Sequence, residues 1–212
     1  MINMIKLLKV VKSLKKTSLK NLVDKRQREF GSFKRKTSYS VFKELCFCVL
    51  TANFNAERSI KMQKEINNDF IKGSKLKLQS ELRRLGHRFP NVRADFIISN
   101  RKYKNKIKEI VFSFEDDQER RDWIVKNIKG LAYKEASHFL RNIGFTNYAI
   151  IDFHIVDILV REKYLKEKPK ILNKKKYIEI EDILKTIGKK LKLNQSELDL
   201  YLWYLETGKV LK

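Results

Sequence analysis

Two helical segments joined at a glycine, over about residues 123–144, constrain the fold of this chain more than any other feature. The first segment has amphipathic helical spacing and breaks at Gly130, and the second runs from about Tyr133 to Ile143. Gly144 follows, and glycine commonly ends helices because it adopts a positive φ without a Cβ clash. The spacing therefore predicts a helix-hairpin-helix. The start of its second helix offers backbone N–H groups to an anion such as a phosphate.

The remainder of the chain also has helical spacing and almost no strand signal. The sequence contains two prolines and seven glycines, with no long alternation of polar and apolar residues and no Asn-Gly turn. We expect an all-α protein of about ten helices, without internal repeats or an obvious linker. Outside the hairpin, helical spacing is found within 1–30 (one or two helices), 39–50, 56–67, just before Gly86, 93–103, 107–114, 152–169, 174–187 and 196–208.

Several helix ends are specific enough to be predicted. Pro169 should end the helix that begins near residue 152, and Gly188 should stop the helix that precedes it. The run Ser196-Glu197-Leu198-Asp199 resembles a capping box that opens the last helix. Gly208 should close that helix.

Charge and cysteine content narrow the possible partners and cofactors. Lys and Arg number 48 against 25 Asp and Glu, a net charge of +23. This charge favours a polyanionic partner, but alone it does not separate DNA from RNA, a ribosome, an anionic membrane or an ordinary solvated surface. Cys46 and Cys48 suit buried, unbridged thiols and supply neither a disulfide nor a four-cysteine iron–sulfur site. The three histidines lack metal-ligand spacing, so no metal or other cofactor is expected.

The sequence has no signal for a membrane or for export. No apolar run approaches the roughly 20 residues of a membrane span. The first 23 residues are interrupted by lysines and lack the cleavage site of a signal peptide. They fit a helix packed on the body through Leu7, Val10, Val11 and Leu14 better than a helix on a membrane surface. We therefore expect a soluble cytoplasmic protein.

Lys134 and Asp152 have the chemistry of a nucleophile and an assisting carboxylate. Lys134 lies in the first turn of the second hairpin helix, where the positive end of the helix dipole disfavours its ammonium form. A neutral lysine amine can attack a sugar at C1′ and leave a Schiff base that permits strand cleavage. Asp152 follows the apolar run 148–151 and precedes helical spacing, so it is also a candidate N-cap. The alternative for Lys134 is a phosphate contact without catalysis, and Lys129 is its nearest rival.

The hairpin sequence KGLAYKEASHFLRNIGF, followed by AIIDFH, closely resembles the archaeal-type 8-oxoguanine DNA glycosylase/AP lyase family of the helix-hairpin-helix DNA glycosylase superfamily. Further matching segments are DKRQREF (24–30), FKELCFCVLTANF (42–54), LGHRF (85–89) and SELDLYLWYLETGKVLK (196–212), so the resemblance covers nearly the whole chain. It departs at Ala132, where the hairpin usually has a second glycine, and at Phe153, where a polar or basic residue is expected. An alanine held at positive φ would cost roughly 1 kcal/mol.

The resemblance implies a DNA repair enzyme that excises 8-oxoguanine from duplex DNA and nicks the abasic site by β-elimination. It implies one unit, 1–212, in which the terminal segments form one helical lobe and the middle forms another, with a DNA-binding cleft between them. Lys134 then forms the Schiff base, and Asp152 stabilises the sugar cation or assists the nucleophile. Lys129, Gly130 and Ala132 contact phosphate. The expected partner is double-stranded DNA containing 8-oxoguanine, bound by a monomer.

Candidates for base recognition follow from the same resemblance. It places Asn53, Arg58 and Arg93 near the cytosine that loses its partner when the lesion flips out. The alternatives are that Asn53 caps a helix and that the arginines meet phosphates. Phe89 and Trp203 are aromatic candidates for stacking on the flipped base, and core packing is the alternative.

Three further basic residues, Lys212, His154 and His138, are considered for the site. The family implicates its terminal lysine, here Lys212, in distinguishing 8-oxoguanine from guanine, and a frayed chain end is the alternative. His154 could tune the Asp152 site or serve as a local hydrogen-bond partner. His138, one turn beyond Lys134, is expected to be structural.

Two other functions stay open at this point. One is a glycosylase for another damaged or mismatched base. The missing iron–sulfur cysteines argue against the endonuclease III-like branch, and a lysine at the nucleophile position argues against a monofunctional adenine enzyme. The other is a non-catalytic helix-hairpin-helix DNA-binding module.

Overall fold

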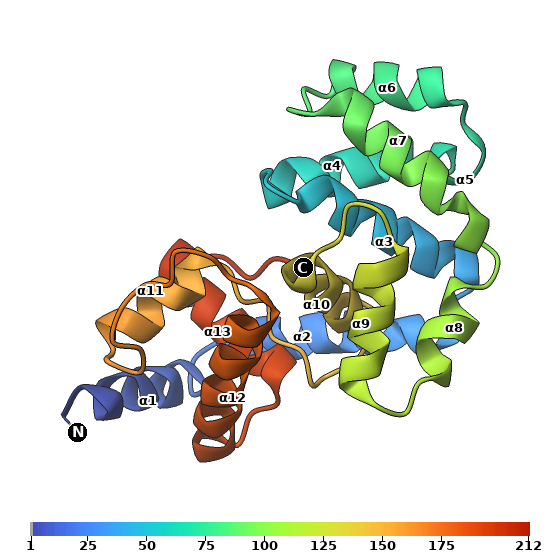
Figure 1. Cartoon of the computed structure of the whole chain (residues 1–212). Coiled ribbons are helices and arrows are strands. Elements are labelled where there is room, and N and C mark those ends of the chain that lie inside the picture. The colour runs from blue at the N-terminus through green and yellow to red at the C-terminus, as the bar shows by residue number, and fades with distance from the viewer. Residues whose placement is uncertain (1) are drawn as a thin grey trace. The chain divides into compact units, whose positions relative to one another are not determined.

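The computed structural model describes residues 2–212, with side chains from residue 6 onward. Within that range the protein consists of thirteen α-helices and two short 3-10 helices, without a strand (Figure 1). The all-α prediction is confirmed. The helices outnumber the ten expected because short ones, such as the four-residue α5 (Asp69–Lys72), are too brief to have a readable period. No helix in the described part combines the length and hydropathy needed to cross a membrane.

The chain divides into two compact units. Unit 1 combines the residues up to Gly31 with Gly144–Lys212, and unit 2 is the continuous segment Ser32–Ile143. Unit 2 contains η1 (Ser32–Arg35), α3 (Ser38–Thr51), α4 (Ala56–Ile66), α5, α6 (Lys75–Arg84), α7 (Pro90–Asn100), η2 (Arg101–Tyr103), α8 (Ile107–Ser113), α9 (Asp117–Asn127) and α10 (Tyr133–Asn142). Unit 1 contains α1 (Ile2–Leu14), α2 (Leu19–Gly31), α11 (Phe153–Arg161), α12 (Lys174–Leu191) and α13 (Gln195–Thr207).

Helix α3 forms the core of unit 2. Its residues from Val41 to Thr51 are buried except Lys43, as expected for a helix that is apolar on nearly every face. It packs against α4, α5, α7, α8 and α10 (Figure 1). The one buried charge on it, Glu44, accepts hydrogen bonds from Gln63 Nε2 at 3.0 Å and Asn142 Nδ2 at 2.7 Å. Both cysteines are reduced thiols buried in this helix, as predicted, and burial raises the pKa of Cys46.

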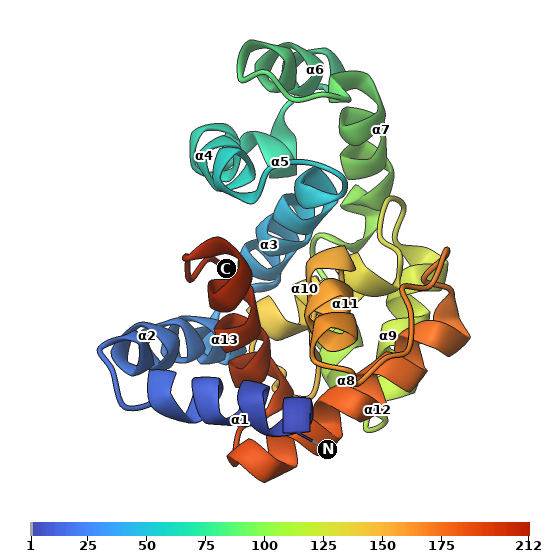
Figure 2. The same cartoon turned by 90° about the vertical axis from the view of Figure 1, so that its left-hand side faces the viewer.

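Helix α13 holds unit 1 together. It packs against α1, α2, α11 and α12 (Figure 2). The predicted packing of the N-terminal helix on the body is confirmed, since Leu7 and Val11 are buried. A side-chain bond between Gln27 Nε2 and Ser196 Oγ, 2.7 Å long, ties α2 to α13.

The structure corrects three of the predicted helix ends. Helix α11 ends at Arg161, well before Pro169. Helix α12 continues through Gly188 to Leu191, and a Cβ at Gly188 would lie 2.8 Å from the carbonyl oxygen of Leu193. The glycine therefore permits a close approach of the chain and does not stop the helix.

The third correction concerns the capping box of α13. It exists, but it starts earlier: Asn194 Oδ1 accepts from Glu197 N, and Glu197 Oε2 accepts from Asn194 N, each at 2.9 Å. Ser196 lies inside the helix, where its hydroxyl serves the contact with α2. The prediction for the other end is confirmed, because Gly208 follows the helix with φ +70.

Candidate active site

The turn between α9 and α10 is built around Gly130. Its φ is +88, and a Cβ there would lie 2.5 Å from Cδ2 of the Phe96 ring. Both the backbone conformation and the neighbouring ring therefore require glycine. Ala132 has φ −96, an ordinary extended conformation, so the strain considered for the missing second glycine is absent. Gly144 ends the hairpin with φ +101, as predicted.

The first turn of α10 carries Lys134 with an acidic neighbour. Ala132 is the N-cap and has no side chain that could accept a hydrogen bond. Instead, Glu135 Oε2 accepts from Ala132 N at 3.3 Å. The other oxygen, Glu135 Oε1, lies 3.4 Å from Lys134 Nζ, whose side chain is 35% exposed while that of Glu135 is 12% exposed. The lysine head group is thus within reach of a ligand and oriented by a nearly buried carboxylate.

Asn100 fixes the turn from the opposite side. Its Oδ1 accepts from Lys129 N, and its Nδ2 donates to Lys129 O, each at 2.9 Å. Asn100 is buried, whereas the Lys129 side chain is exposed. Neither Asn100 nor Glu135 was predicted from the sequence. No local pattern signals Asn100, because its partner is the backbone of a distant residue. Glu135 occupies the N3 position of α10, where an acidic residue that bonds the N-cap backbone is a local signal.

Hydrogen bonds to two loops of unit 2 position three of the candidates for base recognition. Arg93 Nη2 donates to Ala52 O at 2.5 Å, and Ala52 precedes Asn53, which is exposed and has φ +55. Arg58 Nη2 donates to Gly86 O at 2.8 Å, and so connects the start of α4 with the loop before α7. Asn53 does not cap α4, because Asn55 does so through a bond from Arg58 N to its Oδ1.

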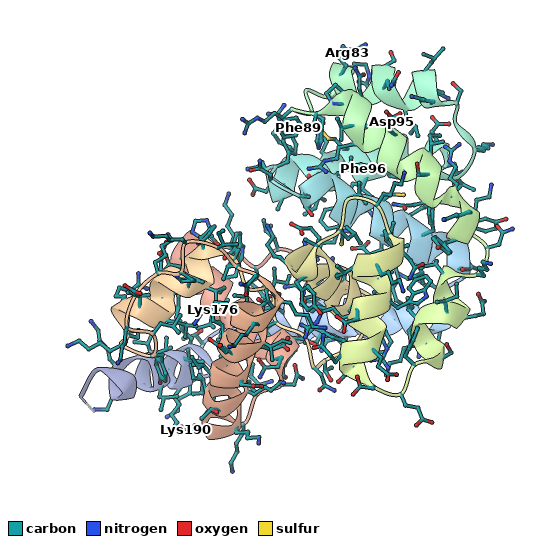
Figure 3. The ribbon with its side chains drawn as sticks, in the orientation of Figure 1. Arg83, Phe89, Asp95, Phe96, Lys176 and Lys190 are labelled. Carbon is teal, nitrogen blue, oxygen red and sulfur yellow. The ribbon has the colours of Figure 1, made fainter. Side chains whose placement is uncertain are left out.

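Aromatic rings surround the Arg93 guanidinium. It lies 5.8 Å from the ring centres of both Phe89 and Phe96. Figure 3 labels these two phenylalanines. The Arg93 Nε atom is buried and has no hydrogen-bond partner among the described residues. Burial lowers the pKa of Arg93, and the carboxylate of Glu135 partly offsets this effect. Arg93 is therefore electrostatically linked to the first turn of α10.

His87 locks the loop that carries Phe89, and it was not predicted as a site residue. Its Nδ1 accepts from Phe89 N at 3.0 Å, so the proton of the neutral ring lies on Nε2, 3.0 Å from Leu50 O. The ring also stacks on Phe54 at 4.2 Å. Burial lowers the pKa of His87, and the nearby positive charges of Arg93 and Arg58 add to that effect. The neutral ring thus joins the end of α3 to the start of α7.

Asp152 lies in unit 1, where it is the N-cap of α11. Its Oδ1 accepts from His154 N at 3.0 Å and from Ile155 N at 3.1 Å, which confirms the predicted cap. The segment that leads to it is held by a tyrosine of α12. Tyr177 Oη donates to Ala149 O and accepts from Ile151 N, at 3.0 and 3.1 Å. Together with the two cap bonds, they fix the direction in which the Asp152 carboxylate points.

The other candidates in unit 1 lie on α11, on α13 and near the end of the chain. The His154 ring stands edge-on to Trp203, with centres 5.5 Å apart, and Trp203 is half-buried. Phe153 is exposed, with Lys168 Nζ 4.9 Å from its ring centre. Lys212 is half-buried, in agreement with a tail that is held in place. Arg26 Nη2 donates to Val210 O at 3.3 Å and anchors that tail.

Two further expectations concern the role of His138 and the presence of metal ligands. His138 is buried in α10 and meets the ring of Phe47 edge-on at 5.5 Å, an arrangement typical of a core residue. No cluster of three or more potential metal ligands occurs among the residues that the structure describes.

Comparison with known proteins adds independent evidence. The family model of 8-oxoguanine DNA glycosylase matches residues 23–193. The 8-oxoguanine DNA glycosylase/AP lyase of Methanocaldococcus jannaschii is 52% identical over 206 residues, which cover 97% of this chain and 99% of that protein. The corresponding protein of Korarchaeum cryptofilum is 47% identical over 202 residues, 95% of this chain and 96% of that one.

The crystal structure of the M. jannaschii enzyme in complex with a 15mer DNA containing 8-oxoguanine superimposes with a TM-score of 0.95 at 52% identity, over 98% of this chain and all of that one. The glycosylase of Thermotoga maritima gives a TM-score of 0.92 at 41% identity, over 99% of this chain and all of that one. These likenesses extend through the hairpin, both units and nearly every helix. The chain therefore belongs to the 8-oxoguanine DNA glycosylase family.

Proposed function

We propose that this chain is a bifunctional DNA glycosylase and AP lyase, which excises 8-oxoguanine from duplex DNA and nicks the abasic site. The observation that carries the proposal is the place of Lys134, in the first turn of α10 directly after the Gly130 turn. There an amine lies beside backbone N–H groups that can bind a phosphate of the nucleotide under attack. The 8-oxoguanine in the DNA bound by the M. jannaschii relative supports the choice of lesion.

In the proposed reaction, the amine of Lys134 attacks C1′ of the damaged nucleoside. A bond between Nζ and C1′ forms as the bond from C1′ to N9 of the base breaks, and the base leaves with that electron pair and takes up a proton. Opening of the sugar ring gives a Schiff base, which acidifies the proton on C2′. Removal of that proton expels the 3′ phosphate, and water releases the lysine. The carboxylate of Asp152 stabilises the positive charge that develops on the sugar.

We assign the remaining residues to DNA recognition. Asn53, Arg58 and Arg93 contact the unpaired cytosine, supported by the backbone carbonyls that hold both arginines beside the Asn53 loop. Phe89 and Trp203 stack on the flipped base, as half-buried aromatic side chains can. The hairpin segment 129–132 binds phosphate through Lys129 and the backbone at Gly130 and Ala132.

We assign Lys212 to recognition of the oxidised part of the base. 8-Oxoguanine differs from guanine by an oxygen on C8 and a hydrogen on N7, and an ammonium can donate to that oxygen. Guanine lacks the acceptor, so a site built around this bond discriminates against it. The protein acts on duplex DNA within the cell, and we propose that it does so in the cytoplasm as a monomer whose two units form one functional domain.

The test uses duplexes that carry a single 8-oxoguanine, another oxidised base, a mismatch or a preformed abasic site. We expect cleavage of the 8-oxoguanine and abasic duplexes. Borohydride should trap a covalent protein–DNA adduct, since it reduces a Schiff base. Lys134→Gln should abolish that adduct while the variant still binds the lesion duplex.

Lys129→Gln is the matched control, because it removes a lysine from the same hairpin. It should weaken binding and leave the adduct. An adduct that survives in Lys134→Gln and disappears in Lys129→Gln would transfer the nucleophile to Lys129. An intact protein that binds the duplexes but cleaves none of them would identify a non-catalytic binding module.

A further inference from the structure

One face of α7 contacts the Asn53 loop and the hairpin turn at 129–132, the two segments of unit 2 that we assign to DNA recognition. Arg93, Phe96 and Asn100 are spaced by three and four residues, so their side chains lie on the same side of the helix. Arg93 holds Ala52, just before Asn53, and Asn100 holds Lys129 in the hairpin turn. Phe96 lies between them on α7 (Figure 3). Its ring fills the space in which a side chain at position 130 would lie.

Asn100 makes the strongest of these contacts with the turn. It engages both backbone groups of Lys129, and an asparagine can do so because it carries a donor and an acceptor side by side. The side chain is 1% exposed, so water does not readily replace it if it is removed. The rest of the turn is held by the buried side chains of Ile128 and Leu131 and by the bond from Ala132 N to Glu135 Oε2. None of these contacts engages the backbone of Lys129, so the position of Lys129 in the turn depends on Asn100.

We propose that Asn100 is a positioning residue for the reaction. It fixes the hairpin turn so that the phosphate contacts at 129–132 and the amine of Lys134 engage the same nucleotide. This inference rests on the proposed function. It adds that catalysis depends on a buried amide that does not itself touch DNA.

The experiment compares full-length Asn100→Ala with Asn142→Ala. Asn142 is the matched control because it is also a buried asparagine, yet it lies at the far end of α10 and bonds Glu44 in the core rather than the hairpin turn. Both variants should melt at lower temperature. Below both melting temperatures, Asn100→Ala should trap abasic DNA with borohydride roughly a hundredfold more slowly than wild type, since small misplacements of reacting groups have effects of about that size. Asn142→Ala should trap it at nearly the wild-type rate.

Salt dependence gives a second readout that a merely structural role would not alter. The probe is a duplex with a tetrahydrofuran abasic analogue, which binds but cannot form a Schiff base. If the turn is displaced, Lys129 no longer neutralises its phosphate, and the slope of log affinity against log salt should fall by about one in Asn100→Ala. The slope should be unchanged in Asn142→Ala.

Equal trapping rates and equal slopes in the two variants would overturn the proposal. If Asn100→Ala does not fold, Asn100→Asp takes its place. It keeps the acceptor for Lys129 N and loses only the donor to Lys129 O, so it should show a smaller loss of trapping rate, and a wild-type rate in it would equally overturn the proposal. Failure of the proposed function would look different, because wild type itself would then give no adduct.

Discussion

Asp152 has two tasks in the proposed mechanism, as the cap of α11 and as the group that stabilises the charge developing on the sugar. Its Oδ1 caps α11 by accepting two backbone N–H groups. Its Oδ2 accepts no hydrogen bond from a described residue, and so can face a substrate. An amide can do the first task as well as a carboxylate, because the cap needs only an oxygen acceptor. An amide cannot stabilise the positive charge that develops on the sugar in the proposed reaction, because it carries no negative charge.

Asp152→Asn should therefore separate the two tasks. We expect a melting temperature close to that of wild type and base excision slower by roughly a hundredfold or more, the size of effect that follows from loss of electrostatic stabilisation. Single-turnover excision and thermal melting measure the two quantities. A collapse of the melting temperature with unchanged activity per folded molecule would reduce Asp152 to a cap.

His87 makes the stability of the protein depend on pH. Burial lowers the pKa of the folded-state ring below its usual value of about 6.5, so the unfolded chain binds more protons below that pH. Stability should fall as pH drops through about 6.5 and continue to fall until the folded-state pKa is passed. Protonation of Nδ1 would also break the bond from Phe89 N.

His87→Gln removes this titration, so the melting temperature of wild type should exceed that of the variant most at pH 8 and progressively less toward pH 5. Melting curves of both proteins over this range check the prediction. A difference that stays constant with pH would show that His87 does not titrate in the accessible range. A difference that widens toward pH 5 would mean that the charged ring is the stabilised one.

At the level of elements, the hairpin turn has one position that requires glycine and one that does not. Gly130→Ala meets both a positive φ and the Phe96 ring, so it should lower the free energy of unfolding by more than about 1 kcal/mol. Ala132→Gly should also destabilise, by roughly 0.4–1 kcal/mol, because it loosens the unfolded chain at a position where alanine already fits. Urea denaturation of both variants measures these changes. A stabilised Ala132→Gly would mean that the turn is strained after all.

The helices were predictable where the signal is local. The apolar run in α3, the breaks at Gly130 and Gly144, and the stop at Gly208 all follow from short-range sterics and periodicity. The error at Gly188 has a different origin. Gly188 is a glycine because Leu193 passes close to it. A sequence pattern contains no information on which distant segment will approach a residue.

The same distinction applies to the candidate site. The positions of Lys134 and Asp152 at helix starts were predictable, because each follows a recognisable break. Asn100 and His87 were not, because their partners are backbone groups of Lys129 and Leu50, far away in the chain. A backbone carbonyl has no residue identity, so such contacts leave no pattern to detect.

At the scale of the whole molecule, the net charge of +23 should dominate binding to DNA. If the protein neutralises six or more phosphates, its affinity for a duplex should fall by roughly a thousandfold or more between 50 and 200 mM salt. The preference for 8-oxoguanine over guanine should change little, because it depends on contacts to the base. Binding titrations of both duplexes across salt concentrations test this. A preference that disappears together with the affinity would place recognition in the phosphate contacts.

Unit 1 is built from two separate stretches of the chain, and this sets the order in which the two units can fold during synthesis on the ribosome. Unit 2 is continuous, so all of it has been synthesised once Ile143 is made. Unit 1 needs α12 and α13 to cover α1 and α2, and these helices are translated after unit 2. Domains of nascent chains fold as their residues become available. The unit that carries Lys134 can thus fold before the unit that carries Asp152.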